Sequence, residues 1–307
     1  MDLGGGVSAH PACPIELPAH WREWLGTLQA EVITGANLLI AIEMPSQTPT
    51  ILDAETQLLD RRLTAMWRGL SLQGVPTYQQ AKILLGGVDD RGETSVRRVS
   101  TPVTAYRHQF GESLDVSSTV LASAKRFADR IDHVYGAVPD FRRVRAGFTA
   151  LNKGIEEHTA AERLHQFVRA MDGLMKLPQG AGRREFTNRG PTFVTGTGLN
   201  GILEQLYLLR NTQEHLNEFR AVIPAPTQRE FDRITSLRAY QAEQAALASY
   251  RRLFDGGPLN DFLTEASIDA FWRLDEAERR RRWGAAFDLD AAAVEHERLF
   301  ALLYDRP

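Results

Sequence analysis

A run of helical patterns constrains the fold of this chain more than any other feature of its sequence. From Leu114 onward, apolar residues recur at spacings of three and four, the pattern of helices that bury one face. The residues from Pro178 to Gly198, rich in Gly and Arg, predict a loop. Helices are predicted over residues 116–134, 141–155, 159–177, 199–219, 227–254, 268–283 and 291–304. We therefore expect an all-α bundle over the last two thirds of the chain.

The first third of the chain has a weaker and more mixed pattern. Residues 1–19 hold three consecutive glycines and three prolines, which predict a loose arm. Further along, helices are expected over 21–32 and 53–70 and strands over 38–43 and 96–110. The sequence thus predicts a mainly α protein with three parts: a small mixed α+β domain with the arm (1–112), a helical bundle (113–256) and a helical extension packed on the bundle (257–307).

Composition limits where such a protein works and what it binds. Of its 307 residues, 43% are hydrophobic and 24% are charged, which is ordinary for a soluble globular protein. The formal net charge of -3 provides no overall basic field for nucleic acid, so only a local basic patch would serve that purpose. A single cysteine, Cys13, excludes an internal disulfide framework. Because the sequence shows no signal peptide and no apolar run of membrane-spanning length, we expect a cytoplasmic protein without a membrane partner.

Three local motifs have simpler interpretations than a ligand site. Residues 196–201 read GTGLNG, but no strand with an acidic end follows the next helix. A loop that starts a helix is therefore favoured over a dinucleotide site, although its backbone N–H groups could still touch a phosphate. His158 and His165 are seven residues apart and lack further ligands nearby, so we expect no metal and no cofactor. The run Arg279–Arg282 is balanced by glutamates and is interpreted as a solvated helix face.

The segment from Leu206 to His215 places an arginine and a histidine on or beside a strongly apolar helix. Arg210 lies four residues after Leu206, close to the face that should be buried. On a straight helix, Arg210 and His215 diverge by about 140°, so a long side chain or a helix break would have to join them. The simpler alternative is an ion pair between Arg210 and Glu214 at i, i+4, with His215 an ordinary surface or packing histidine.

This segment resembles the HEPN family, and in particular its Apea-like branch. RNTQEH at 210–215, preceded by LEQLYLL, is similar to the family's motif of an arginine, a polar residue and a later histidine. The stretch from Ala150 to Lys176 resembles the hallmark helix of that branch. LNDFLTEASIDAFW and the Arg-rich stretch up to Trp283 resemble its C-terminal part. The resemblance covers about Leu114 to Trp283.

Two positions after the histidine depart from the family's pattern. Members often have a small residue such as Gly directly after the histidine, where this chain has Leu216. Members that are toxins paired with a nucleotidyltransferase antitoxin often carry a tyrosine where this chain has Asn217. Leu216 bears on the loop geometry that exposes the imidazole of His215. Asn217 makes control by a nucleotidyltransferase antitoxin less expected.

The resemblance implies a HEPN-type helical bundle that forms a homodimer and cuts single-stranded RNA without metal, in a bacterial defence or toxin context. His215 is then expected to transfer protons, Arg210 to bind the scissile phosphate and Asn211 to orient one of them. The 2′-hydroxyl of the RNA would attack, leaving a 2′,3′-cyclic phosphate and a 5′-hydroxyl. Three arginines of the predicted loop are expected to guide RNA: Arg183, Arg184 and Arg189.

Other functions stay open beside the nuclease. A non-catalytic HEPN module would bind RNA or dimerise as a scaffold, a role favoured by Leu216 and the acidic net charge. An all-α adaptor would bind a protein partner, for which the N-terminal domain offers a surface. A small-molecule enzyme has the least support, because no cofactor or metal motif stands out.

Overall fold

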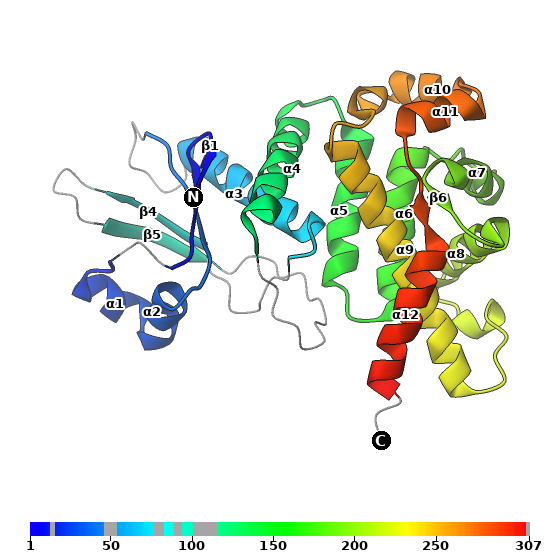
Figure 1. Cartoon of the computed structure of the whole chain (residues 1–307), viewed down its shortest axis with the longest axis horizontal. Helices are drawn as coiled ribbons and strands as arrows, with labels where there is room; N and C mark the ends of the chain where they lie inside the picture. The colour runs from blue at the N-terminus through cyan, green and yellow to red at the C-terminus, as the bar shows by residue number, and fades with distance from the viewer. Residues whose placement is uncertain (13–15, 46–53, 76–82, 89–93, 101–115, 305–307) are drawn as a thin grey trace. The chain divides into compact units, whose positions relative to one another are not determined.

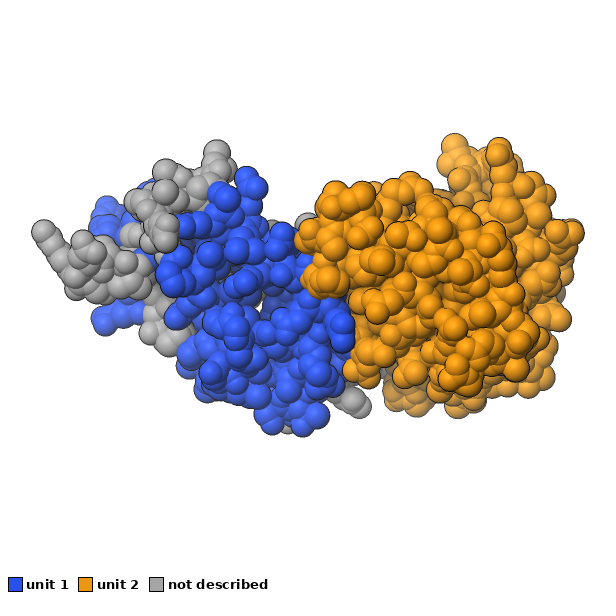
Figure 2. Space-filling model, turned by 90° about the horizontal axis from the view of Figure 1, so that it is seen from above, with its two compact units in different colours: residues 1–132 blue, residues 133–307 orange. Residues whose placement is uncertain are grey.

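The computed structural model describes residues 1–12, 16–45, 54–75, 83–88, 94–100 and 116–304. Within these residues there are twelve α-helices and seven short strands (Figure 1). The predicted fold class is confirmed: the chain is mainly helical, with a small antiparallel sheet and short helices in its N-terminal part. Contacts divide the chain into two compact units, Met1–Asp132 and His133–Pro307 (Figure 2). This division falls inside helix α4 (Ser118–Gly136), and the predicted domain limits at 112 and 256 stay a prediction.

The first unit contains a three-stranded antiparallel sheet in the order β1 (Asp2–Gly4), β2 (Val7–His10), β3 (Leu39–Ile42). Strands β2 and β3 pair in register from Val7 opposite Ile42 to His10 opposite Leu39. The other elements are α1 (Ala19–Leu25), α2 (Thr27–Thr34), α3 (Ala54–Leu72) and the antiparallel pair β4 (Ile83–Val88) and β5 (Thr94–Ser100). A small apolar core holds part of this unit together: Leu17, Leu25, Ala30, Ile33 and Val96.

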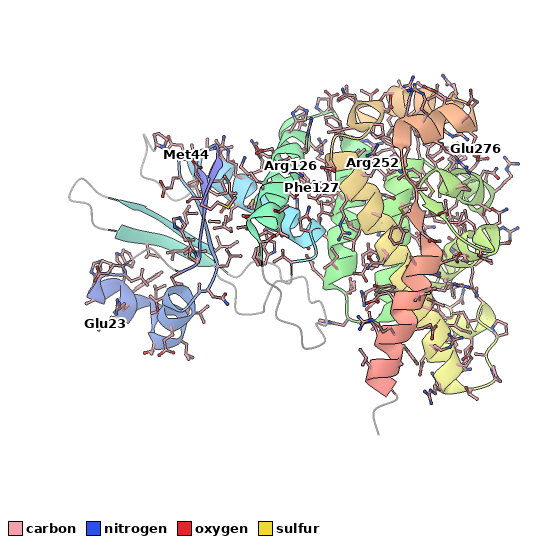
Figure 3. The ribbon with its side chains drawn as sticks, viewed as in Figure 1. Glu23, Met44, Arg126, Phe127, Arg252 and Glu276 are labelled. Carbon is pink, nitrogen blue, oxygen red and sulfur yellow. The ribbon has the colours of Figure 1, made fainter. Side chains whose placement is uncertain are left out.

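The second unit is a helical bundle that begins with the last turn of α4. Its elements are α5 (Arg142–Glu156), α6 (Ala160–Met175), α7 (Gly182–Arg189), β6 (Val194–Thr195), α8 (Leu199–Glu214), α9 (Gln228–Phe254), α10 (Glu265–Arg273), α11 (Glu276–Trp283), β7 (Phe287–Asp288) and α12 (Leu289–Tyr304). Side chains from α5, α6 and α9 fill the space between these helices (Figure 3). None of the helices in the described ranges has the length and hydropathy needed to cross a membrane.

Helices α5 and α6 approach each other closely because glycines face each other at their crossing. A Cβ added to Gly173 would lie 2.7 Å from the Cα of Gly147, a distance that real Cβ atoms essentially never show. Helix α9 closes the same region, where the buried hydroxyl of Tyr250 donates to the carbonyl of Ala170 at 3.1 Å. An ion pair between Arg163 and the buried Glu243 also joins α6 to α9. These contacts hold α6 in place as one wall of the site described below.

The connection from α6 to α8 differs from the predicted loop. Residues Gly182–Arg189 form helix α7, so the loop prediction is wrong over that range. One apolar side chain, Phe186, anchors α7, and a single apolar residue leaves no helical repeat to detect in the sequence. Helix α8 also ends at Glu214 rather than near Phe219, the end that the sequence predicts.

Two segments far apart in the sequence meet next to the start of α8. Strand β6 pairs in parallel with β7, with Val194 opposite Phe287. Just beyond β6, the backbone N–H and the hydroxyl of Thr197 both donate to Oδ2 of Asp290 at 2.8 Å. A carboxylate of the chain itself therefore accepts hydrogen bonds from the GTGLNG loop. Within the described residues, α8 is followed by a 3₁₀ turn and α9, and not by the strand that a dinucleotide fold requires.

Candidate functional site

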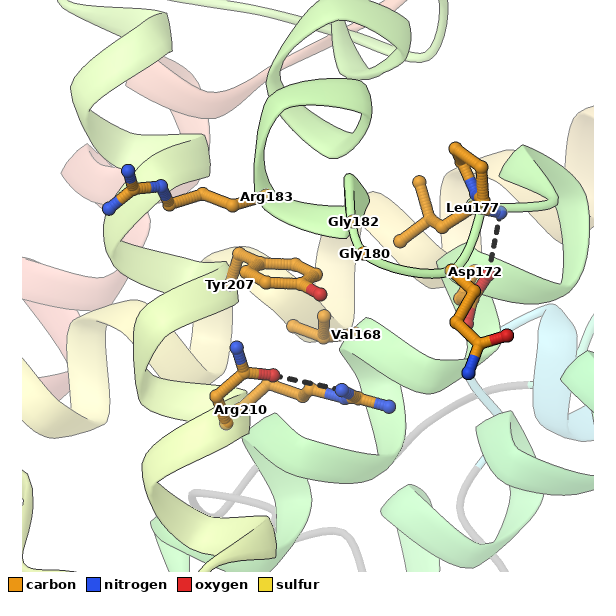
Figure 4. A pocket seen from close by; sticks show the side chains of 11 residues that line it. Val168, Asp172, Leu177, Gly180, Gly182, Arg183, Tyr207 and Arg210 are labelled. Carbon is orange, nitrogen blue, oxygen red and sulfur yellow. Dashed lines mark hydrogen bonds between the residues drawn. The ribbon is translucent and has the colours of Figure 1, made fainter.

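Arg210 and Asn211 line a cavity of about 410 Å³ in the second unit (Figure 4). Its walls come from α6, α7, α8 and the turn between α6 and α7. Helix α6 contributes Val168 and Asp172, which share a face at i, i+4. Arg183 lines the cavity from α7. The structure therefore places three of the six predicted site residues around one hollow.

The burial pattern of α8 explains why polar side chains reach this cavity. Leu203, Leu206 and Leu209 are buried and hold the helix against the bundle. Tyr207 and Arg210, three residues apart, lie at the edge of that apolar face and line the cavity instead. The arginine therefore sits beside the buried stripe, as its spacing predicts.

The guanidinium of Arg210 is held on one side by residues of its own helix. Its Nη1 donates to Oδ1 of Asn211 at 2.9 Å and lies 2.7 Å from Oε2 of Glu214. The ion pair at i, i+4 that the sequence allowed is thus present. The Arg210 side chain is 19% exposed, and its Nε and Nη2 have no hydrogen-bond partner among the described residues. The protein therefore holds the guanidinium through Nη1, while the edge formed by Nε and Nη2 keeps its donors unpaired among the described residues.

His215 stands apart from this cavity at the C-cap of α8. Its backbone N–H still donates to Asn211, but its side chain is exposed and does not line the cavity. In the described part of the chain the imidazole has no hydrogen bond or ion pair. The structure therefore does not bring the imidazole of His215 to the guanidinium of Arg210 within one chain, in line with the divergence expected on a straight helix.

A Schellman motif ends α8 directly after His215. Leu216 has a φ of 56° in the left-handed region, and its N–H donates to Gln213 at 3.1 Å. The N–H of Asn217 donates to the carbonyl of Thr212 at 2.9 Å, which completes the motif. The residue where the family often has glycine thus occupies a backbone conformation that favours glycine.

The three arginines predicted to guide RNA lie in different surroundings. Arg183 is 60% exposed at the cavity and lies 3.6 Å from a carboxylate oxygen of Glu204. Arg184 is 75% exposed and does not line the cavity. Arg189 is 20% exposed, donates to the carbonyls of Met175 and Lys176, and stacks over a tryptophan at 5.0 Å. Arg189 therefore binds the carbonyl groups at the C-terminal end of α6, whereas the side chains of Arg183 and Arg184 are exposed.

Two residues near the site were not predicted as site residues from the sequence, where His165 was considered only as a metal ligand. Tyr207 lines the cavity with its ring. His165 is half-buried on α6, and burial lowers its pKa, with Arg169 and Arg210 acting in the same direction. His165 and Val168 are three residues apart, so their spacing places them on one face of α6. Only the packing of α6 on α8 shows which residues this face contacts.

The described residues contain no group of three or more His, Cys, Asp or Glu side chains arranged to hold a metal ion. His158 precedes α6, so it does not share a helix with His165. Comparison of the chain with protein-family models, curated proteins and solved structures gives no match.

Proposed function

We propose that this protein is a HEPN-type, metal-independent endoribonuclease that cuts single-stranded RNA. The observation that carries the proposal is the setting of Arg210, which lines a solvent-open cavity with one guanidinium edge fixed by Asn211 and Glu214. A guanidinium held in this way is pre-organised to bind a phosphate through its free edge. The RNTQEH segment and its flanking helices supply the family resemblance.

In the proposed reaction, the 2′-hydroxyl of RNA attacks the adjacent phosphorus and the 5′-oxygen of the next nucleotide leaves. Arg210 binds the non-bridging oxygens and stabilises their charge in the transition state. Asn211 orients Arg210, as their hydrogen bond of 2.9 Å allows. The 2′-hydroxyl loses a proton and the leaving 5′-oxygen gains one. His215 carries out one of these two transfers and water the other, because an imidazole titrates near neutral pH.

A homodimer would complete this site. Within one chain, His215 lies outside the cavity that holds Arg210. In a two-fold dimer, each copy can present its exposed His215 to the cavity of the other, so that both sites gain a complete set of groups. We therefore include homodimerisation in the proposal, along with a cytoplasmic defence or toxin role and a protein partner for the N-terminal domain.

The test is cleavage of a mixed single-stranded RNA pool in EDTA by the parent protein, Arg210→Ala and His215→Ala. We expect the parent to produce 2′,3′-cyclic phosphate and 5′-hydroxyl ends and both variants to lose at least 100-fold in rate. Arg280→Ala is the matched control, since Arg280 also forms an ion pair at i, i+4, with Glu276 on α11, and does not line the cavity. Products with 5′-phosphates, or a requirement for magnesium, would contradict the mechanism.

A second candidate is a non-catalytic module that binds RNA through the same cavity. It is favoured by the position of His215 outside the cavity and by Leu216, which stands in the left-handed position after it. This module would retain RNA, lose it in Arg210→Ala and keep it unchanged in His215→Ala, without cleavage. A protein adaptor, by contrast, would show no affinity for RNA even at low salt.

A further inference from the structure

Tyr207 presents an aromatic ring to the cavity between two cationic side chains. Figure 4 shows the ring lying between Arg183 and Arg210. The central guanidinium carbon of Arg210 lies 5.9 Å from the ring centre. The ring of Phe186 supports Tyr207 from α7, with centres 5.7 Å apart and planes tilted by 45°. Tyr207 is therefore a fixed aromatic surface beside the proposed phosphate site.

Gly182 sets the position of the Tyr207 hydroxyl. A Cβ added to Gly182 would lie 2.1 Å from the hydroxyl oxygen of Tyr207 and 2.9 Å from Cζ of the ring. Any larger residue at the start of α7 would push the ring away. The φ of Gly182 is not in the left-handed region, so the backbone conformation does not require glycine here. The close approach of Tyr207 is the reason for glycine at this position.

The cavity has the size and the mixture of surfaces that a nucleotide requires. Its volume of about 410 Å³ falls within the range of roughly 300–1,000 Å³ found for small-molecule sites. Val168 and Leu177 supply apolar wall, and Arg183 and Arg210 supply positive charge. The carboxylate of Asp172, also in the lining, is paired with Arg143 at 3.1 Å. Bases of single-stranded RNA bind to proteins by stacking on aromatic rings, while cations bind the backbone.

We propose that the base of one ribonucleotide stacks on Tyr207 while the adjoining phosphate binds Arg210 and Arg183. This inference rests on the proposed RNA site but concerns base binding rather than cleavage. An inorganic anion would need the two arginines alone, whereas a nucleotide also needs the ring. Gly182 acts as a positioning residue, because a side chain there would meet the hydroxyl and Cζ of Tyr207.

The experiment measures binding of a fluorescent, fully 2′-O-methylated single-stranded RNA, which cannot be cleaved by attack of its 2′-oxygen. The same oligonucleotide with an abasic site at each position in turn serves as the second probe, and inorganic phosphate as competitor. We expect Tyr207→Ala to weaken binding about 5- to 150-fold and Tyr207→Phe to stay within about twofold, since the ring carries the stacking. An abasic site at the bound position should weaken binding to the parent and have little further effect in Tyr207→Ala.

A glycine pair and an arginine pair provide matched controls. Gly182→Ala should weaken binding at least about fivefold, and the double variant Gly182→Ala/Tyr207→Phe should recover part of it, because the clashing hydroxyl is gone. Gly201→Ala, on α8 with nothing within 4 Å of the added Cβ, should bind like the parent. Arg183→Ala should weaken binding, whereas Arg280→Ala, on α11 away from the cavity, should bind like the parent.

The outcomes separate this inference from the proposed nuclease. Equal binding by Tyr207→Phe and Tyr207→Ala would overturn base stacking, as would equal binding of the abasic and intact RNAs by the parent. Displacement of the RNA by millimolar phosphate with no dependence on Tyr207 would show an anion site alone and would also overturn it. Tyr207-dependent binding by a parent that does not cleave RNA in EDTA would support the base site and contradict the nuclease.

Discussion

Arg210 already has a negatively charged partner before any ligand arrives. Glu214, 45% exposed, lies 2.7 Å from Nη1 and offsets part of the charge that a phosphate would meet. Replacing this carboxylate by an amide removes the competing charge and keeps the size of the side chain. We expect Glu214→Gln to raise the affinity for the uncleavable RNA by about two- to fivefold at low salt, as measured by fluorescence anisotropy.

The matched control for this prediction is Glu276→Gln. Glu276 forms an ion pair at the same spacing with Arg280 on α11, and neither residue lines the cavity. Both variants change the net charge by the same amount, so a general electrostatic effect would appear in both. Equal gains in the two variants, or a loss in Glu214→Gln, would show that Glu214 does not compete with RNA.

Leu216 carries backbone strain without burial to offset it. Its φ is 56°, and its side chain is 90% exposed. In the left-handed region the Cβ crowds the following carbonyl, which glycine avoids. Leu216→Gly should therefore stabilise the protein by roughly 0.5–1 kcal/mol in urea unfolding.

Leu216→Ala separates this effect from the loss of an exposed apolar side chain. Alanine keeps the Cβ, so its stability should match that of the parent. A similar gain in both variants would mean that the exposed leucine, and not the backbone conformation, lowers the stability.

Spacing along one helix was enough to predict part of the site. The ion pair between Arg210 and Glu214 follows from i, i+4 geometry, whereas the hydrogen bond from Arg210 to Asn211 joins adjacent residues and does not follow from spacing. Tyr207 and Asp172 meet at the cavity only because α8 packs on α6 and α7. A single sequence does not show which helix faces lie against each other, so these partners were missed.

Helix α12 docks on α9 through a buried histidine. His296 is 6% exposed, and its Nε2 lies 2.8 Å from the hydroxyl of Ser236. Burial lowers its pKa below the ordinary 6.5, and Arg233 acts in the same direction, while Glu297 opposes them. The folded state therefore holds His296 neutral more strongly than the unfolded state does.

This shift predicts how stability changes with pH. Between the lowered pKa of the folded state and 6.5, the unfolded chain binds more protons at this histidine than the folded chain does, so the free energy of unfolding rises with pH. The contribution of His296 to stability is fully present above pH 6.5 and is lost as the pH falls through the lowered pKa. Urea unfolding between about pH 5.5 and 7.5 should show this slope, and His296→Phe should have a smaller one. His165 shifts in the same direction, so part of the slope should remain. An unchanged slope in His296→Phe would rule out a contribution from His296.

Elements with a regular apolar face were predicted well, and elements held by a few contacts were not. Helices α5, α6 and α9 match their predicted spans because a buried stripe runs along each of them. Strands β6 and β7 have two residues each, and the pairing between them joins distant parts of the chain. Such a short strand has no alternation to detect, and nothing local in the sequence identifies its partner.

At the scale of the whole molecule, the proposed dimer makes a quantitative prediction. If each site combines Arg210 of one copy with His215 of the other, then mixing Arg210→Ala with His215→Ala regenerates one intact site in every mixed dimer. Random exchange of subunits should restore about a quarter of the parent cleavage rate, because half of the dimers are mixed and one of their two sites is intact. No recovery, in a mixture shown by light scattering to have exchanged subunits, would place both residues of a site in one chain.

The link between Thr197 and Asp290 has a consequence for the order in which the protein matures on the ribosome. The start of α8, which leads to Arg210, is held by a carboxylate that lies 93 residues further along the chain. A nascent chain that has exposed α8 still lacks this anchor until the ribosome has released residues through Asp290. The start of α8 thus gains this anchor only late in synthesis, after all the helices that line the cavity have emerged.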